Sequence, residues 1–167
     1  TAPVHVYPLA YTPTCGKAMG EWLWANGYCQ ATYISVFHNQ LWSQNRLQGL
    51  REAFAVAGYG ECIDVCSVDD AWLEGVAVPE PRGEQWRSSL RDRLRVVLRA
   101  QARELFNEVR ARGSTVWVCC NDEIACAALA YLEEHGQEAG KDVAVVGFGD
   151  SEGAMEAGLT TFSFNAI

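Results

Sequence analysis

Short apolar runs recur along the chain, separated by segments of a different pattern. These runs are rich in β-branched residues and are bounded by polar or glycine-containing turns, which predicts strands. They span residues 31–37, 62–68, 115–120, 142–148 and 160–165. Because most of them lack a polar alternate face, we expect strands that are buried on both sides.

Between the runs, apolar residues recur at three- and four-residue steps, which predicts amphipathic helices. The helical segments are residues 14–26, 47–57, 90–109 and 124–132, with a short helix or turn over 151–158. A glycine follows each longer segment, as is typical of helix C-termini. These glycines are Gly27, Gly58, Gly113 and Gly136.

Two segments depart from the alternation. Residues 4–11 form an apolar run that contains Pro8, which predicts an edge or crossover strand. Residues 69–85 contain Pro79, Pro81 and two glycines, and we interpret them as a loop or an insertion. The other elements predict an α/β fold, a three-layer sandwich in which helices cover both faces of a parallel sheet.

Composition narrows the class of protein. The chain has 167 residues, enough for one domain with a sizeable core, and no apolar run long enough for a membrane helix. Its net charge of -8 makes it a poor nucleic-acid binder by itself. Residues 82–112 differ, with nine arginines against four acidic residues, and we interpret them as one solvated face of a long helix.

The seven cysteines do not predict a disulfide framework or a metal site. Their number is odd, no C-x-x-C pair occurs, and no histidine follows them at zinc-site spacing. Most of them, including Cys119 and Cys120, lie in apolar runs, where a free cysteine packs as a small hydrophobe. We therefore expect free thiols, a reducing cytosolic compartment, and no metal or cofactor.

Polar side chains follow four of the predicted strands. Ligands of open α/β sheets bind beyond the carboxyl ends of the strands, so these residues are candidates for a polar cleft. Strand ends are also polar simply because they meet loops, and that alternative stays open. The four groups are His38-Asn39-Gln40, Asp69-Asp70, Asn121-Asp122-Glu123 and Gly149-Asp150-Ser151.

Five residues near these strand ends carry individual predictions. Asn121 is placed to cap the following helix, which is compatible with presenting its side chain to a ligand. Arg46, expected in the first turn of its helix, opposes the helix dipole there and so indicates either a partner or plain exposure. Trp42, Trp72 and Trp86 are expected in or beside strand-end loops, either stacking on a sugar or base or anchoring the loop.

An enzymatic function has little support in the sequence. The G-x-S-x-G, phosphate-loop, H-E-x-x-H and G-x-G-x-x-G motifs are absent, and the three histidines are far apart. An aspartate nucleophile at Asp69 or Asp150 stays open, although no lysine or phosphate-binding group accompanies either residue.

Three stretches together resemble the effector-binding domain of the lac repressor (LacI/GalR) family of bacterial transcription regulators. "CGKAMGEWLWANGYCQATYISV" is similar to the family's small-residue helix, turn and strand, and "SQNRLQGLREAFAVAG" to its Arg-x-x-Gly helix. Residues 116–165 resemble its strand, Asn-Asp turn, helix, "DVAVVGF" strand and "LTT" crossover. The resemblance covers nearly the whole chain except about 68–90, and its last stretch is the most specific.

The resemblance implies a periplasmic-binding-protein-like (type I) lobe without catalysis. Residues 1–13 would cross from a missing N-terminal lobe, residues 14–159 would form the C-terminal lobe, and residues 160–167 would cross back. It also implies a sugar or sugar-acid effector, a homodimer, and operator DNA bound through a helix-turn-helix domain that this chain lacks. We therefore expect a cytoplasmic protein without membrane association.

The resemblance also implies site residues. Arg46 matches the arginine that grips sugar hydroxyls or a carboxylate, and Asn121 matches the asparagine at the pocket floor. Where the family often has "GFDD" or "GYDD", this chain has Gly149 before Asp150, as in the gluconate-repressor branch. Loss of an acid beside an arginine favours an anionic effector. The predicted ligand-binding residues are Asn39, Trp42, Arg46, Trp72, Trp86, Asn121, Glu123 and Asp150.

Two other classes of function stay open at this point. A solute-binding protein of a sugar transporter would have the same fold, and a leader sequence in place of a helix-turn-helix would distinguish it. An enzyme of flavodoxin-like architecture would need turnover that depends on Asp69 or Asp150.

Overall fold

The computed structural model describes residues 12–69, 71 and 83–164. Helices and strands alternate through these residues as the apolar pattern predicts. They are α1 (Thr14–Ala25), β1 (Ala31–Ser35), α2 (Leu41–Val56), β2 (Ile63–Ser67), α3 (Gly83–Ala111), β3 (Val116–Cys119), α4 (Asp122–Glu134), β4 (Ala144–Phe148), α5 (Glu152–Glu156) and β5 (Thr160–Phe162).

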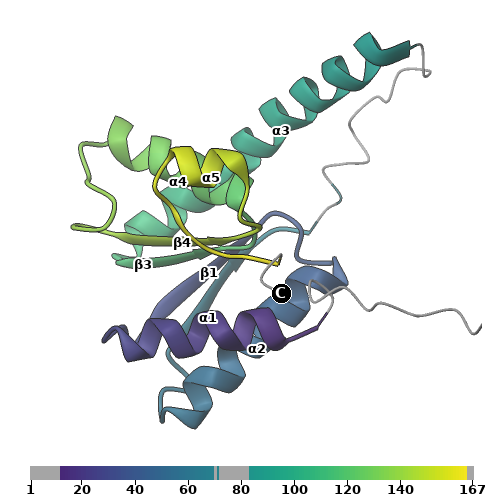
Figure 1. The fold of residues 1–167 in the computed structure, drawn as a ribbon. Coiled ribbons are helices and arrows are strands. Elements are labelled where there is room, and N and C mark those ends of the chain that lie inside the picture. The colour runs from purple at the N-terminus through teal and green to yellow at the C-terminus, as the bar shows by residue number, and fades with distance from the viewer. Residues whose placement is uncertain (1–11, 70, 72–82, 165–167) are drawn as a thin grey trace, which may run out of the picture.

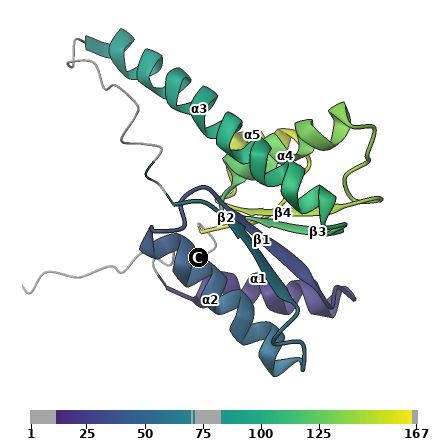
Figure 2. The same cartoon turned by 180° about the vertical axis from the view of Figure 1, so that it is seen from behind.

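The strands form one five-stranded sheet in the order β2-β1-β3-β4-β5, and every neighbouring pair is parallel. Helices α1 and α2 pack together on one face of the sheet, and α3, α4 and α5 lie on the other (Figure 1). The view from behind shows the same three layers (Figure 2). The predicted α/β sandwich with a parallel sheet is confirmed.

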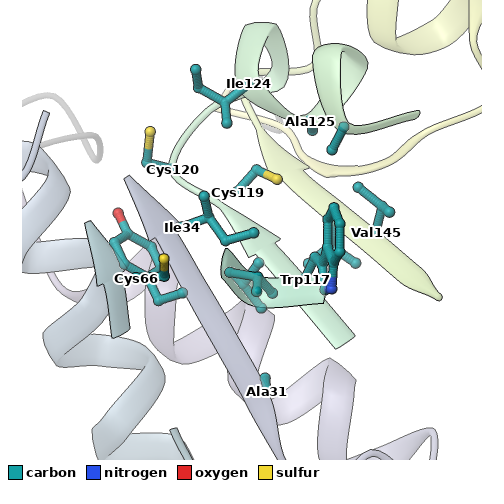
Figure 3. Packing of buried hydrophobic residues seen from close by; sticks show 14 of the residues in the cluster. Ala31, Ile34, Cys66, Trp117, Cys119, Cys120, Ile124, Ala125 and Val145 are labelled. Carbon is teal, nitrogen blue, oxygen red and sulfur yellow. The ribbon is translucent and has the colours of Figure 1, made fainter. Parts of the chain in front are cut away.

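The core lies on both faces of the two central strands. Every residue of β1 and of β3 is buried, which agrees with the continuous apolar runs in the sequence. Trp117 of β3 stacks on Phe106 of α3 with ring centroids 5.6 Å apart, and Tyr131 of α4 lies against both rings. Figure 3 shows how side chains from several elements meet around β3.

Two helices begin earlier than the apolar pattern predicts. Helix α2 begins at Leu41, and not at residue 47 as predicted. Its first turns bury Ser43 and Arg46, and a polar buried face leaves no apolar period to detect. Helix α3 begins at Gly83, so residues 83–85 are also helical, and residues 4–11 and 72–82 lie outside the described residues.

The four glycines expected to end helices are confirmed in that role. Gly27, Gly58, Gly113 and Gly136 follow the C-termini of α1, α2, α3 and α4, and each has a positive φ. Each position tolerates this left-handed backbone because glycine lacks a Cβ.

Helix α3 is the longest element, with 29 residues. Its C-terminal half packs on the sheet through residues such as Ala102, Phe106 and Val109, which are buried. Its N-terminal part extends away from the rest of the molecule in both views (Figures 1 and 2).

Candidate functional site

The carboxyl ends of all five strands meet at one edge of the sheet, because the strands are parallel. Main-chain hydrogen bonds join the segments that leave this edge. The amide of His38 donates to Val68, that of Cys120 to Ile34, and that of Gly149 to Phe162. The polar groups predicted from the strand ends therefore come from neighbouring segments of this edge.

Arg46 of α2 is the buried cation of this edge. Its side chain is 6% exposed, and its Nη1 donates a hydrogen bond to the main-chain carbonyl of Cys120 at the end of β3. Because α2 begins at Leu41, Arg46 lies in the second helical turn and not in the first turn as predicted. The hydrogen bond to the Cys120 carbonyl, and not an interaction with the helix dipole, therefore explains the position of Arg46.

Three aromatic rings surround the Arg46 guanidinium. Its central carbon lies 4.6 Å from the ring centroid of Trp42, 5.1 Å from that of Phe148 and 5.1 Å from that of Phe164. Cations over ring faces at these distances are attracted by the ring quadrupoles. Trp42 comes from the same helix, whereas Phe148 ends β4 and Phe164 follows β5.

The Arg46 charge has no acidic counterpart in the part of the chain that the structure describes. It forms no ion pair there, and its buried Nε has no hydrogen-bond partner among those residues. A buried cation without a carboxylate is costly, and so is an unsatisfied buried donor. The arrangement suits a site that an anion completes.

Three hydroxyl groups form a hydrogen-bonded series near Arg46. The Oγ of Ser43 lies 2.9 Å from the hydroxyl oxygen of Tyr33 and 2.8 Å from that of Ser35, and all three residues are buried. Burial raises the pKa of Tyr33 well above its usual range, so this phenol stays protonated. These hydroxyl groups satisfy one another's hydrogen bonds and, being neutral, supply no negative charge to Arg46.

Asp122 is a buried carboxylate at the same edge, which the sequence indicated only as one member of the polar group at residues 121–123. It is 3% exposed, and it accepts hydrogen bonds from the amide of Ser151 at 2.9 Å and the hydroxyl of Thr161 at 2.5 Å. Both donors lie far along the chain, so local sequence carried no signal of them. Its two oxygens therefore bind the segment after β4 and strand β5.

Asp150 stands in an unusual backbone conformation beside Asp122. It is the one non-glycine residue with a positive φ, +54°, in the described part of the chain. Its amide donates to the Thr161 hydroxyl at 3.3 Å, and its side chain is half-buried. Gly149, which replaces the family's acid, has a φ of +144°, and a Cβ there would lie 3.1 Å from Asp122 Oδ2.

Comparison with known proteins decides the family. A family model described as "Periplasmic binding protein-like domain" matches residues 21–166, most of the chain. The chain belongs to this family. Among curated proteins, a sequence search finds no match.

Solved structures share the fold of this periplasmic-binding-protein-like chain. A LacI-family transcriptional regulator from Enterococcus faecium with bound ribose superposes with a TM-score of 0.66 at 16% identity, covering 89% of this chain and 47% of that one. A LacI regulator from a Rhodococcus species gives 0.68 at 18% identity, covering 92% and 48%. The dimeric lac repressor gives 0.63 at 18% identity, covering 89% and 46%.

These comparisons confirm the predicted resemblance and the predicted fold class. This periplasmic-binding-protein-like chain spans about half the length of the solved structures it matches. The predicted division into residues 1–13, 14–159 and 160–167 stays a prediction.

Asn121 of the periplasmic-binding-protein-like chain caps α4, as predicted. Its backbone is extended, and its Oδ1 accepts a hydrogen bond from the amide of Ile124 at 3.0 Å. The residue is half-buried, so the capping oxygen is occupied while the side chain still borders the edge. Its predicted role in ligand binding stays a prediction.

The other predicted site residues fall in different places. Glu123 forms an ion pair with Arg95 of α3 at 3.6 Å, and Asn39 is exposed. Trp42 and Trp86 lie in the first turns of α2 and α3, so they lie beside the preceding segments and not within a loop, because both helices begin earlier than the apolar pattern indicates. Trp72 lies outside the described residues.

All seven cysteines are free, and the adjacent pair at the end of β3 is buried (Figure 3). Cys120 hydrogen-bonds with Ser35 on the side of Arg46, whereas Cys119 lies near Cys126 and Asp122 of α4. Consecutive residues along a strand point to opposite faces of the sheet, which accounts for this difference. Burial raises the pKa of Cys120 to about 11, so it packs as a neutral thiol.

The described residues offer neither a metal-binding cluster nor a membrane-spanning helix. Within those residues, no group of three or more His, Cys, Asp or Glu side chains could hold a metal ion. No helix there is both long enough and apolar enough to cross a bilayer.

Proposed function

We propose that the chain is an effector-binding lobe of a LacI-family transcription regulator and that its effector is a sugar acid. One observation carries the proposal: Arg46 is a buried cation at the carboxyl edge of the sheet with no carboxylate partner in the described part of the chain. The effector carboxylate would approach Arg46 and supply the missing charge.

The surroundings of Arg46 favour an acid over a neutral sugar. The aromatic rings attract the guanidinium but carry no net charge, and the Cys120 carbonyl and the Cys15 thiol, which contact its donors, are not carboxylates. Arginine binds carboxylates through two parallel hydrogen bonds, which are stronger than bonds to neutral hydroxyls. Asp122 does not compete for Arg46, because its oxygens accept from Ser151 and Thr161.

The role of the whole protein follows from the family. We propose a cytoplasmic homodimer that binds operator DNA through a separate helix-turn-helix domain. The effector would bind one conformation more tightly than the other and so change the fraction of DNA-competent dimers. The fold shared with the ribose-bound regulator and with the dimeric lac repressor supports this proposal.

Isothermal titration of the full-length protein tests the site. We expect D-gluconate to bind and D-glucose to bind more weakly, and Arg46→Ala to weaken gluconate binding at least about tenfold. Arg51→Ala is the matched control, because Arg51 is an exposed arginine of the same helix. Unchanged gluconate binding by Arg46→Ala would rule out the proposed site.

The gene sequence upstream of Thr1 distinguishes a transcription regulator from a solute-binding protein. A helix-turn-helix segment supports a regulator. An export signal with no helix-turn-helix segment would instead indicate a solute-binding protein of a transporter.

A further inference from the structure

Asp122 is hydrogen-bonded both to the residue after Asp150 and to Thr161 of β5, which in turn binds Asp150. Its Oδ2 accepts from the amide of Ser151, the residue after Asp150. Its Oδ1 accepts from the Thr161 hydroxyl, and that hydroxyl accepts from the amide of Asp150 itself. Two consecutive amides, at positions 150 and 151, are therefore fixed by one buried carboxylate, one of them directly and the other through Thr161.

The backbone around Asp150 needs such anchoring. A left-handed conformation at a residue with a Cβ is strained, and it persists where the surroundings hold it. Asp150 adopts this conformation with a φ of +54°. The hydrogen bonds to Asp122 and Thr161 are the contacts that hold it.

Two glycines make room for the Asp122 carboxylate. A Cβ on Gly147 would lie 2.5 Å from Oδ1, and a Cβ on Gly149 would lie 3.1 Å from Oδ2. Any larger residue at 147 would displace the carboxylate. Gly149, the second glycine of "GFGD", therefore has a structural role besides its effect on the charge of the site, because it leaves room for Asp122.

We infer that Asp122 is a positioning residue that holds the half-buried Asp150 carboxylate in place at the effector-binding edge. Asp122 is itself buried, and each of its oxygens already accepts a hydrogen bond, one from Ser151 and one from Thr161, so we expect it to act through Asp150 and not by contact with a ligand. Asp150 would then accept hydrogen bonds from ligand hydroxyl groups. This inference rests on the proposed function of the edge.

Amide hydrogen exchange of the full-length protein tests the positioning without any ligand. Thr161→Val removes the bridging hydroxyl, and Thr161→Ser keeps it. We expect Thr161→Val to speed exchange at the amides of Asp150 and Ser151 about tenfold or more while α4 stays protected, and Thr161→Ser to match the wild type. If both amides are as well protected in Thr161→Val as in the wild type, the inference is overturned.

A double-mutant cycle tests the consequence for binding, with D-gluconate as the titrated probe. We expect Asp122→Asn and Asp150→Asn each to weaken binding by about tenfold, and the double variant to be no weaker than either single variant. Effects that multiply would indicate a merely structural Asp122 and would also overturn the inference. If the wild type does not bind gluconate, the proposed effector is wrong, and the exchange measurement alone decides the positioning.

Discussion

The backbone of Gly16 in α1 lies directly against the backbone of Arg46 in α2. A Cβ built on Gly16 would sit 1.9 Å from the carbonyl oxygen of Arg46. Gly49, one turn further along α2, meets Pro13 in the same way, again at 1.9 Å from a carbonyl oxygen. The two helices therefore cross in backbone contact, and this crossing sets the position from which Arg46 reaches the sheet edge.

Gly16→Ala should be strongly destabilising. The new methyl group has only backbone atoms in front of it, so α1 and α2 must separate. We expect the free energy of unfolding to fall by about 2–3 kcal/mol, measured by urea denaturation. Gly153→Ala in α5 is the control, since nothing lies within 4 Å of its Cβ. Wild-type stability in Gly16→Ala would show that the helices are not in contact.

Arg46→Met and Arg46→Ala should differ in stability although both remove the charge. Methionine keeps most of the buried volume, and removal of an unpaired buried cation offsets the hydrogen bond lost at the Cys120 carbonyl. Alanine leaves a cavity between the rings. We expect Arg46→Ala to be less stable than Arg46→Met by about 2 kcal/mol in denaturant titrations. Equal stabilities would contradict the packed environment of this side chain.

Substitution of Asn121 should separate capping from binding. Asn121→Ala removes the acceptor of the Ile124 amide, so we expect a loss of about 1 kcal/mol in unfolding free energy. Asn121→Ser retains a capping oxygen and should keep wild-type stability. A gluconate affinity that falls in Asn121→Ser would then identify the amide group as a ligand contact. Equal stability of the alanine and serine variants would contradict the capping role.

Stability should fall as the pH rises above about 9. An unfolded cysteine loses its proton near pH 8.5, whereas burial raises the pKa of Cys120 to about 11 and that of Cys66 to about 12. Between these values the unfolded state binds fewer protons than the folded state, so each thiol lowers the unfolding free energy by up to about 1.4 kcal/mol per pH unit.

Cys120→Ala checks this pH dependence, because it removes one of the buried thiols. We expect a shallower decline of the unfolding free energy between pH 9 and about 11 than in the wild type. Val118→Ala is the control, since it truncates a fully buried neighbour on β3 without removing a titrating group. A slope as steep in Cys120→Ala as in Val118→Ala would contradict the prediction.

The sequence predicts the fold well because the signals are local. The buried runs of β1 and β3, the helical periods and the glycines that end the helices each lie within one segment. The start of α2 was missed because its buried face is built from Ser43 and Arg46, which carry no apolar period. Arg46 itself was predicted, from an expected position in the first helical turn that was wrong by one turn and from its resemblance to a family position.

The surroundings of the site depend on contacts between distant segments. Phe148 and Phe164 reach Arg46 only because β4 and β5 follow β3 in the sheet. Asp122 meets its donors 29 and 39 residues further along the chain. No pattern within a window of sequence indicates such pairs, so the ring contacts and the anchoring of Asp150 required the structure.

The reach of α3 beyond the sheet divides that helix into two thermodynamic regions. At 1.5 Å per residue its 29 residues span roughly 44 Å. The C-terminal turns share the cooperative unfolding of the core through Phe106 and Val109, whereas residues 92–96 are exposed or half-buried and gain less stability from packing. Fraying that reaches residues 92–96 should therefore stop where packing begins near Leu98, well before the core itself opens.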